Sequence, residues 1–311
     1  MRVRLSIALG VLAAVAWAVP VSGAARFFAG ERTRQVSPHS PLPQPTRFRV
    51  NRDRGLLIST WINGRGPFVF VIDTGAGLNV ISERLVSATG LKITTTRQTL
   101  VSGLSAVTTS SNREAAIDAL ALGYKNNLLP PGKTALVISY LPAGVDGILD
   151  PTEAFAPYGY SIDIPNGQIE ALDDAGELSH RSSTDGATVE WLRREDSNRP
   201  FVRLGDGRLA LIDTGSRFGL AISEHQAIVV SRDKTPHTIP SLDLGGGTIN
   251  ARRVAPTTIS IGELVLRGIP TDILSGVAQD APVILGRDAL YPFKISFDPR
   301  RRLIAFATGE R

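Results

Sequence analysis

The sequence contains no cysteine among its 311 residues. This absence excludes disulfide frameworks, zinc–thiolate sites, cysteine nucleophiles and a lipid anchor on an N-terminal cysteine. Histidines are few and none has metal-ligand spacing; they are His39, His180, His225 and His237. The glycine run at 245–247 lacks the Gly-Lys-Ser/Thr that a phosphate-binding loop needs. Neither a metal site nor a nucleotide site is therefore indicated.

Long helical apolar patterns are also scarce. Val, Ile and Thr are plentiful, and 30 glycines and 20 prolines mark frequent turns, which predicts an all-β protein. A hydrophobic fraction of 42% with 20% charged residues is typical of a folded globular chain. The length allows two domains, or one unit of two similar lobes.

The N-terminus carries the pattern of an export signal. Residues 1–24 have a basic start, an apolar run over 5–21 and a small-x-small pattern at Ser22 and Ala24. Pro20 breaks the run just before these small residues, which favours cleavage. An uncleaved membrane anchor is the alternative, because the run approaches spanning length. We therefore expect an exported protein, either periplasmic or secreted.

The rest of the chain is only slightly basic. Removing the two arginines of the signal leaves 34 − 2 = 32 Lys and Arg against 29 Asp and Glu, a net charge of +3, which does not suggest a nucleic-acid partner. Residues 25–45 have no strand or helix period and indicate a linker or a short propeptide. The polar stretch 173–187 is the best internal boundary, so the chain divides into 46–185 and 186–311.

One motif occurs in both of these parts. PFVFVIDTGAGLNVIS at 67–82 and RLALIDTGSRFGLAIS at 208–223 each run from an apolar strand into Asp-Thr-Gly, and each ends in Ile-Ser. A carboxylate at the end of a buried strand is costly unless it is hydrogen-bonded or has a function. Two such carboxylates, Asp73 and Asp213, suggest that the two copies meet.

A second shared element lies downstream of each copy. Ile148-Leu149-Asp150 matches Ile284-Leu285-Gly286, and both are followed by a short helical pattern, a strand, a turn and a strand. A repeat of this length indicates one structural unit used twice.

Together these motifs resemble the retropepsin-like and pepsin-like aspartic proteases, over roughly 46–172 and 188–306. The resemblance implies two similar lobes of the retropepsin-like β-barrel type, with the active site between them. It implies an aspartic endopeptidase that acts on a protein or peptide substrate and needs no cofactor or metal. Because both halves lie in one chain, a monomer is expected.

The resemblance also assigns roles to residues. Asp73 and Asp213 would be the catalytic carboxylates, which share one proton and activate a water molecule. The supporting residues would be Thr74, Gly75, Thr214, Gly215 and Ser216. The threonines would hydrogen-bond across the interface, and the glycines would allow close approach of the backbone. A Ser216 hydroxyl bonded to the neighbouring carboxylate would lower its pKa, which predicts that Asp213 is the ionised partner.

Two features depart from the family pattern. Asp150 stands where the pattern has glycine, and no flap tyrosine is evident in 97–110. Residues 102–104 and 245–247 are candidate hairpin tips. The rival interpretation is a non-catalytic binding or assembly protein of the cell envelope on the same fold, because fold alone does not establish function.

Overall fold

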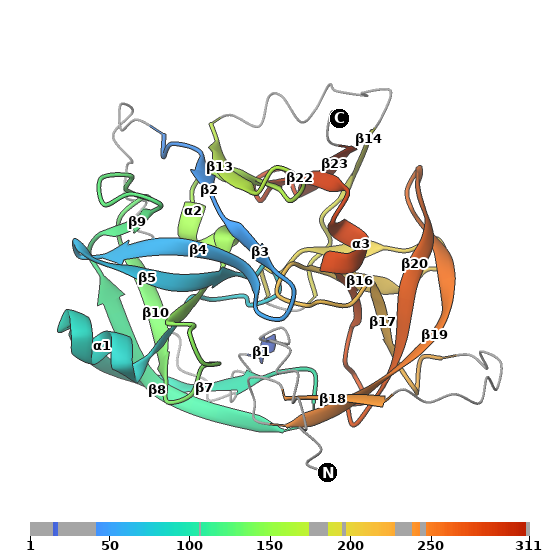
Figure 1. Cartoon of the computed structure of the whole chain (residues 1–311), viewed down its shortest axis with the longest axis horizontal. Helices are drawn as coiled ribbons and strands as arrows, with labels where there is room; N and C mark the ends of the chain where they lie inside the picture. The colour runs from blue at the N-terminus through green and yellow to red at the C-terminus, as the bar shows by residue number, and fades with distance from the viewer. Residues whose placement is uncertain are drawn as a thin grey trace, which may run out of the picture.

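In the part of the chain that the structure describes, the fold consists of three β-sheets and three short helices (Figure 1). The computed structural model describes residues 15–17, 42–105, 107–173, 186–194, 197–227, 238–242 and 247–308. We call the sheets N-terminal, C-terminal and shared, after the parts of the chain that supply their strands. In Figure 1 the N-terminal sheet lies on the left, the C-terminal sheet on the right and the shared sheet at the top. The predicted all-β, two-lobed fold is confirmed.

The N-terminal sheet has ten strands. Their order is β1 (Val15–Trp17), β7 (Ile93–Ser102), β8 (Thr108–Ile117), β10 (Lys133–Ile138), β6 (Val80–Ser82), β11 (Gly147–Leu149), β5 (Arg65–Ile72), β4 (Gly55–Ile62) and β3 (Arg49–Asn51), with β9 (Leu120–Leu122) paired to β4.

The C-terminal sheet has seven strands. Their order is β15 (Phe201–Arg203), β16 (Leu209–Asp213), β21 (Val283–Gly286), β17 (Leu220–Ser223), β20 (Leu264–Ser275), β19 (Thr248–Ile261) and β18 (Thr238–Leu242).

The centres of these two sheets repeat the same topology. β5 pairs parallel with β11, which pairs antiparallel with β6, which pairs parallel with β10. β16, β21, β17 and β20 pair in the same sequence of directions. Each Asp-Thr-Gly motif therefore follows a central strand whose neighbour is the downstream Ile-Leu strand.

The shared sheet joins the two parts of the chain. Its order is β14 (Gly186–Glu190), β23 (Leu303–Thr308), β22 (Phe293–Asp298), β12 (Gly159–Asp163), β13 (Gln168–Leu172) and β2 (Thr46–Arg47). β12 of the first part pairs directly with β22 of the second. Most of the predicted boundary stretch lies outside the described residues, so the division between 185 and 186 stays a prediction.

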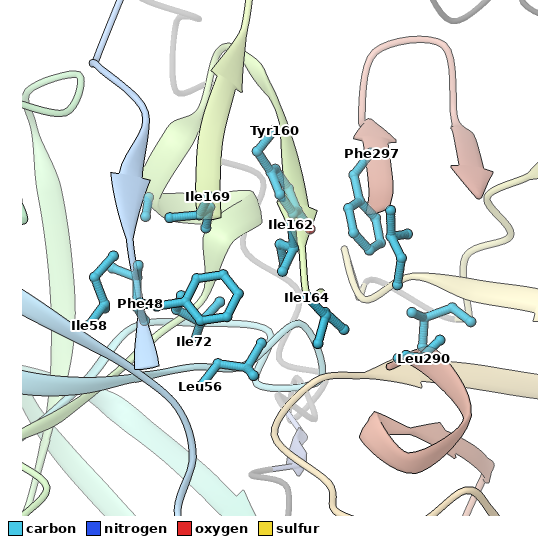
Figure 2. Packing of buried hydrophobic residues seen from close by; sticks show 14 of the residues in the cluster. Phe48, Leu56, Ile58, Ile72, Tyr160, Ile162, Ile164, Ile169, Leu290 and Phe297 are labelled. Carbon is cyan, nitrogen blue, oxygen red and sulfur yellow. The ribbon is translucent and has the colours of Figure 1, made fainter. Parts of the chain in front are cut away.

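The core crosses from one part to the other beneath the shared sheet. One apolar cluster includes residues of all three sheets. In Figure 2 the side chains run from Leu56 and Ile72 through Ile164 to Leu290 of helix α3 (Arg287–Leu290). Tyr160 of β12 and Phe297 of β22 stack with ring centroids 4.7 Å apart. Both lobes thus share one continuous hydrophobic core.

Local sequence signals explain the turns and helix ends. Helix α1 (Glu83–Thr89) begins at Ser82, whose Oγ accepts a hydrogen bond from the Leu85 amide at 3.2 Å. It ends at Gly90, whose φ of 67° is the left-handed conformation of a helix C-terminus. The predicted hairpin at Asn63-Gly64 has positive φ at both residues and joins β4 to β5. Helix α2 (Pro151–Phe155) is the short helix predicted after the first Ile-Leu element.

Strand β1 lies within the predicted signal segment. Val15–Trp17 pairs antiparallel with Leu100–Ser102 of β7. The rest of residues 1–24 is outside the described residues. Among those described, no helix is long and apolar enough to span a membrane.

Candidate active site

The two aspartates lie at equivalent ends of the central strands and are almost completely buried. Asp73 follows β5 and is 2% exposed, whereas Asp213 is the last residue of β16 and is 0% exposed. The amide of Asp73 donates to Leu149 O of β11 at 3.0 Å. In the second copy, Asp213 pairs with Gly286 of β21. The downstream Ile-Leu strands therefore hold both aspartates in place.

The threonines of the two motifs bond reciprocally across the interface. The Thr74 amide donates to Thr214 Oγ1, and the Thr214 amide donates to Thr74 Oγ1, both at 3.1 Å. The Thr74 hydroxyl donates to Ile212 O at 2.6 Å, and the Thr214 hydroxyl donates to Ile72 O at 3.0 Å. Each threonine is thus tied to the strand that carries the opposite aspartate, as the sequence predicted.

The glycines allow each loop to approach the opposite aspartate. A Cβ atom on Gly75 would lie 2.8 Å from Asp213 Cγ, and one on Gly215 would lie 2.4 Å from Asp73 Cγ. Real Cβ atoms do not come this close, so any side chain would force the loops apart. Glycine at both positions therefore brings the two carboxyls to one place.

Backbone amides bind the aspartates locally. The Gly75 amide donates to Asp73 Oδ1 at 2.8 Å, and the Ser216 amide donates to Asp213 Oδ1 at 3.0 Å. The Ser216 hydroxyl accepts from the Phe218 amide at 3.3 Å. The hydrogen bond to Asp213 thus comes from the backbone of residue 216, a donor that every residue except proline supplies.

Burial raises the pKa of Asp213 well above the ordinary value for a carboxyl, and the charge of Asp73 raises it further. The Ser216 amide and the charge of Arg287 oppose this rise in the pKa, while a hydrogen bond with the Asp73 side chain adds to it. The direction is opposite to the one that the sequence predicted for Asp213. The Ser216 hydroxyl on which that prediction depended accepts from the Phe218 amide instead, and removal from water outweighs the bond from the Ser216 amide.

Arg287 is a supporting residue that sequence reasoning missed. The residue is 4% exposed, and its Nη1 donates to Thr214 O at 3.0 Å and to Gly215 O at 2.7 Å. Nη2 donates to Arg52 O at 3.1 Å. Its position directly after Ile-Leu-Gly was the available signal, because that element was already matched to the motif.

The hairpin between β7 and β8 reaches from the N-terminal to the C-terminal sheet. Leu104 at its tip is 2% exposed and packs in an apolar cluster with Phe201 and Phe218. The Ala278 amide donates to Leu104 O at 3.0 Å. Ser105 forms an antiparallel bridge with Val277. The predicted tip at 102–104 is therefore docked on the opposite lobe.

The second predicted tip lies largely outside the described residues. Of 245–247, only Gly247 is described, directly before β19. A Cβ atom on Gly247 would lie 2.0 Å from Ser105 Oγ. The two hairpin ends therefore touch. Among the described residues, no group of three or more His, Asp or Glu side chains could hold a metal ion.

Comparisons with known proteins agree with this geometry. Residues 58–149 match the sequence model of a family described as aspartyl protease. A search of the curated proteins gives no match. The fold is similar to the crystal structure of an aspartic proteinase from Irpex lacteus, with a TM-score of 0.53 and 11% sequence identity, over 86% of this chain and 97% of that chain. The predicted resemblance to the aspartic proteases is confirmed.

Proposed function

We propose that the protein is an aspartic endopeptidase whose catalytic pair is Asp73 and Asp213. The observation that carries this proposal is the reciprocal bonding of Thr74 and Thr214, with Gly75 and Gly215 against the opposite aspartates. This arrangement brings together two buried carboxyls from strands 140 residues apart in sequence. Two acids in one buried place cannot both ionise easily, so they share a proton.

The shared proton gives the pair both functions that peptide hydrolysis needs. The ionised carboxyl takes a proton from a water molecule, and the water oxygen attacks the peptide carbonyl carbon. The protonated carboxyl donates its proton to the carbonyl oxygen, which gives a tetrahedral diol. A proton then passes to the leaving nitrogen, the C–N bond breaks, and a carboxylic acid and an amine are released. No covalent enzyme intermediate is formed.

The edge of β7 supports a peptide as substrate. Val15–Trp17 already pairs antiparallel with Leu100–Ser102, so this edge accepts an extended chain. An extended substrate would gain main-chain hydrogen bonds at the same edge, with side chains providing selectivity. Cleavage of the predicted signal after residue 24 would free this edge.

Access to the pair requires movement. Asp73 and Asp213 are 2% and 0% exposed, so a substrate reaches them only after a covering segment moves away. The β7–β8 hairpin is the segment we expect to open, because Leu104 and Ser105 hold its tip on the C-terminal lobe. We further propose that the protein acts as a monomer and that residues 1–24 export it.

Cleavage of a peptide library tests the function directly. We expect cleavage by the wild type, inhibition by a statine-type transition-state mimic, and loss of cleavage in Asp73→Asn and in Asp213→Asn. Both variants should stay folded, because asparagine retains the size of the side chain, and their effects should not add. Near-normal turnover in either variant would remove the assignment of the pair. A folded wild type that cleaves nothing would favour a binding or assembly role.

A further inference from the structure

Asp150 stands immediately beside Asp73 in the N-terminal sheet. Leu149 of β11 pairs with Ile72 of β5 in parallel register, so the next residues along the two strands are Asp150 and Asp73. Neighbouring strands are about 4.8 Å apart. Asp150 is 1% exposed. A third carboxyl is therefore buried on the side of Asp73, near enough for the charge of Asp73 to raise its pKa.

The Asp150 carboxyl has one bonded and one unbonded oxygen. Oδ1 accepts a hydrogen bond from the Thr152 amide at 3.0 Å and so caps α2. Oδ2 is fully buried and has no hydrogen-bond partner among the described residues. Capping uses only Oδ1, and asparagine provides an equivalent oxygen. The N-cap therefore does not explain why an acid stands here.

The titratable groups that face Asp150 are acids, and its charged form is favoured by the amide and hydroxyl of Thr152. These acids are Glu153 of α2, Asp73 after β5 and Tyr160 of β12. Burial raises the pKa of Asp150 well above its ordinary value, and the charges of Glu153 and Asp73 raise it further. Burial also raises the pKa of Tyr160, whose hydroxyl lies 3.1 Å from Thr152 Oγ1. Asp150 thus carries a proton in acid, and its ionisation affects Asp73.

We propose that Asp150 is a positioning residue that acts on the catalytic pair through Asp73: as the pH rises it loses its proton before the pair does, and its negative charge then holds the last proton on the pair. The inference rests on the proposed function, because it assigns a pH range to that same site. Its consequence is an active, singly protonated pair at a higher pH than two carboxyls alone would maintain.

The order of proton loss follows from the hydrogen bonds. The ionised form of Asp150 keeps its bond from the Thr152 amide, while a proton on Oδ2 meets no acceptor. Asp213 Oδ2 also has no partner among the described residues, but a hydrogen bond with the Asp73 side chain raises the pKa of Asp213 and favours retention of the last proton of the pair. Bonds to the ionised form favour release of a proton, and bonds to the neutral form favour its retention.

Asp150→Asn removes the titration and keeps the cap. We expect the basic limb of its kcat/KM profile against pH to move toward acid by about one pH unit, because the like charge beside Asp73 is gone. Activity at the optimum should change by less than about threefold, an effect below 1 kcal/mol. The matched control is Asp118→Asn, which removes an exposed acid and should overlay the wild type.

Asp150→Gly removes both the carboxyl that titrates and the N-cap of α2, whereas Asp150→Asn removes only the titration. It should shift the basic limb as far as Asp150→Asn does, but it should also lower the urea midpoint at every pH because the cap is lost. A purely capping role would destabilise the glycine variant and leave the basic limb of both variants in place, which would overturn the inference.

A measurement of stability separates this inference from the proposed function. Because the pKa of Asp150 is raised in the folded state, the wild type loses stability relative to Asp150→Asn as the pH rises from the unfolded pKa through the folded one. This difference should be smaller in an Asp73→Asn background, because Asp73 then adds no charge. A coupling that grows with pH supports the inference even if no peptide is cleaved. Additive effects at pH 4 and at pH 8 would overturn it.

Discussion

The two Asp-Thr-Gly loops share a topology but are stabilised by different polar groups. In the N-terminal lobe, Asp150 follows the neighbouring strand and caps α2. In the C-terminal lobe the equivalent residue is Gly286, and Arg287 after it donates to the loop carbonyls. Proline occupies the position of Arg287 in the first copy, at residue 151. A buried acid thus flanks one aspartate, and a buried cation flanks the other.

The Asn79 side chain acts as a spacer. It explains how the N-terminal lobe accommodates a side chain at residue 150, whereas the C-terminal lobe has no space for one at residue 286. The Gly286 amide donates directly to Gly219 O at 3.0 Å, whereas the Asp150 amide donates to the side-chain oxygen of Asn79 at 3.1 Å. A Cβ atom on Gly286 would lie 2.5 Å from Phe218 O. Because the Asn79 amide group intervenes in the first lobe, the strand end there has space for a side chain.

The contacts between the two loops are the same in both directions, whereas the groups behind each loop differ. The threonine and glycine contacts are reciprocal, since each lobe positions the aspartate of the other. Behind each loop, Asp150 bonds within its own lobe, whereas Arg287 also reaches the N-terminal lobe at Arg52 O and Gly55. Duplication therefore fixes the interface, while the groups behind the two loops differ in charge.

The largest expected effect concerns the β7–β8 hairpin, which belongs to the N-terminal lobe and docks on the C-terminal lobe. Ser105 and Val277 form an antiparallel bridge between them, and bridged residues lie within the Cα separation of a disulfide. The chain has no native cysteine, so within one chain Ser105→Cys with Val277→Cys can form only this bond. We expect oxidation to abolish peptide cleavage and a reductant to restore it.

The single variants Ser105→Cys and Val277→Cys serve as controls for this disulfide. Neither should respond to oxidation, and the oxidised double variant should stay folded. Full activity in the oxidised, cross-linked protein would show that the hairpin need not open, and the closed tip would then have no role in substrate entry.

The next effect removes the cation from the C-terminal lobe. Arg287→Met keeps the apolar stem but leaves two buried carbonyls, those of Thr214 and Gly215, and the part-buried carbonyl of Arg52 without their donor. We expect a loss of about 3 kcal/mol in the free energy of unfolding and reduced activity, because the Asp213 loop loses its support. Urea unfolding measures the loss. Arg267→Met, at an exposed position of β20, should change stability by less than about 0.5 kcal/mol.

The smallest expected effect tests whether the Asn79 spacer gives residue 150 space that residue 286 lacks. Gly286→Ala should cost about 2 kcal/mol, because the new methyl group meets Phe218 O and Ser216 O. Asp150→Ala, measured in acid where that carboxyl is neutral, should cost about 1 kcal/mol for the lost cap. Equal costs at the two positions would mean that the lobes do not differ in the space they provide.

Much of this architecture could be predicted from the sequence because its signals are local. Ser82 and Gly90 mark the ends of α1, Asn63-Gly64 marks a hairpin, and two apolar runs into Asp-Thr-Gly mark equivalent strands. The interlock of the threonines followed from the resemblance, since nothing in a single copy specifies its partner.

The electrostatics could not be read from the sequence because they depend on burial and on three-dimensional neighbours. The sequence predicted a low pKa for Asp213 from one hydroxyl, but desolvation raises that pKa and the hydroxyl of Ser216 accepts from Phe218 instead. The role of Arg287 depends on a carbonyl 235 residues away. The space beside Asp150 depends on Asn79, which no motif marks.

The central claim is that each chain builds its own site from two unequal lobes. The most direct measurement mixes the folded variants Asp73→Asn and Asp213→Asn and assays peptide cleavage over a range of concentrations. Because both aspartates of a working pair come from one chain, we predict that the mixture stays as inactive as either variant alone. Recovery of activity on mixing, increasing with concentration, would show that chains combine their lobes to form the site and would contradict this account.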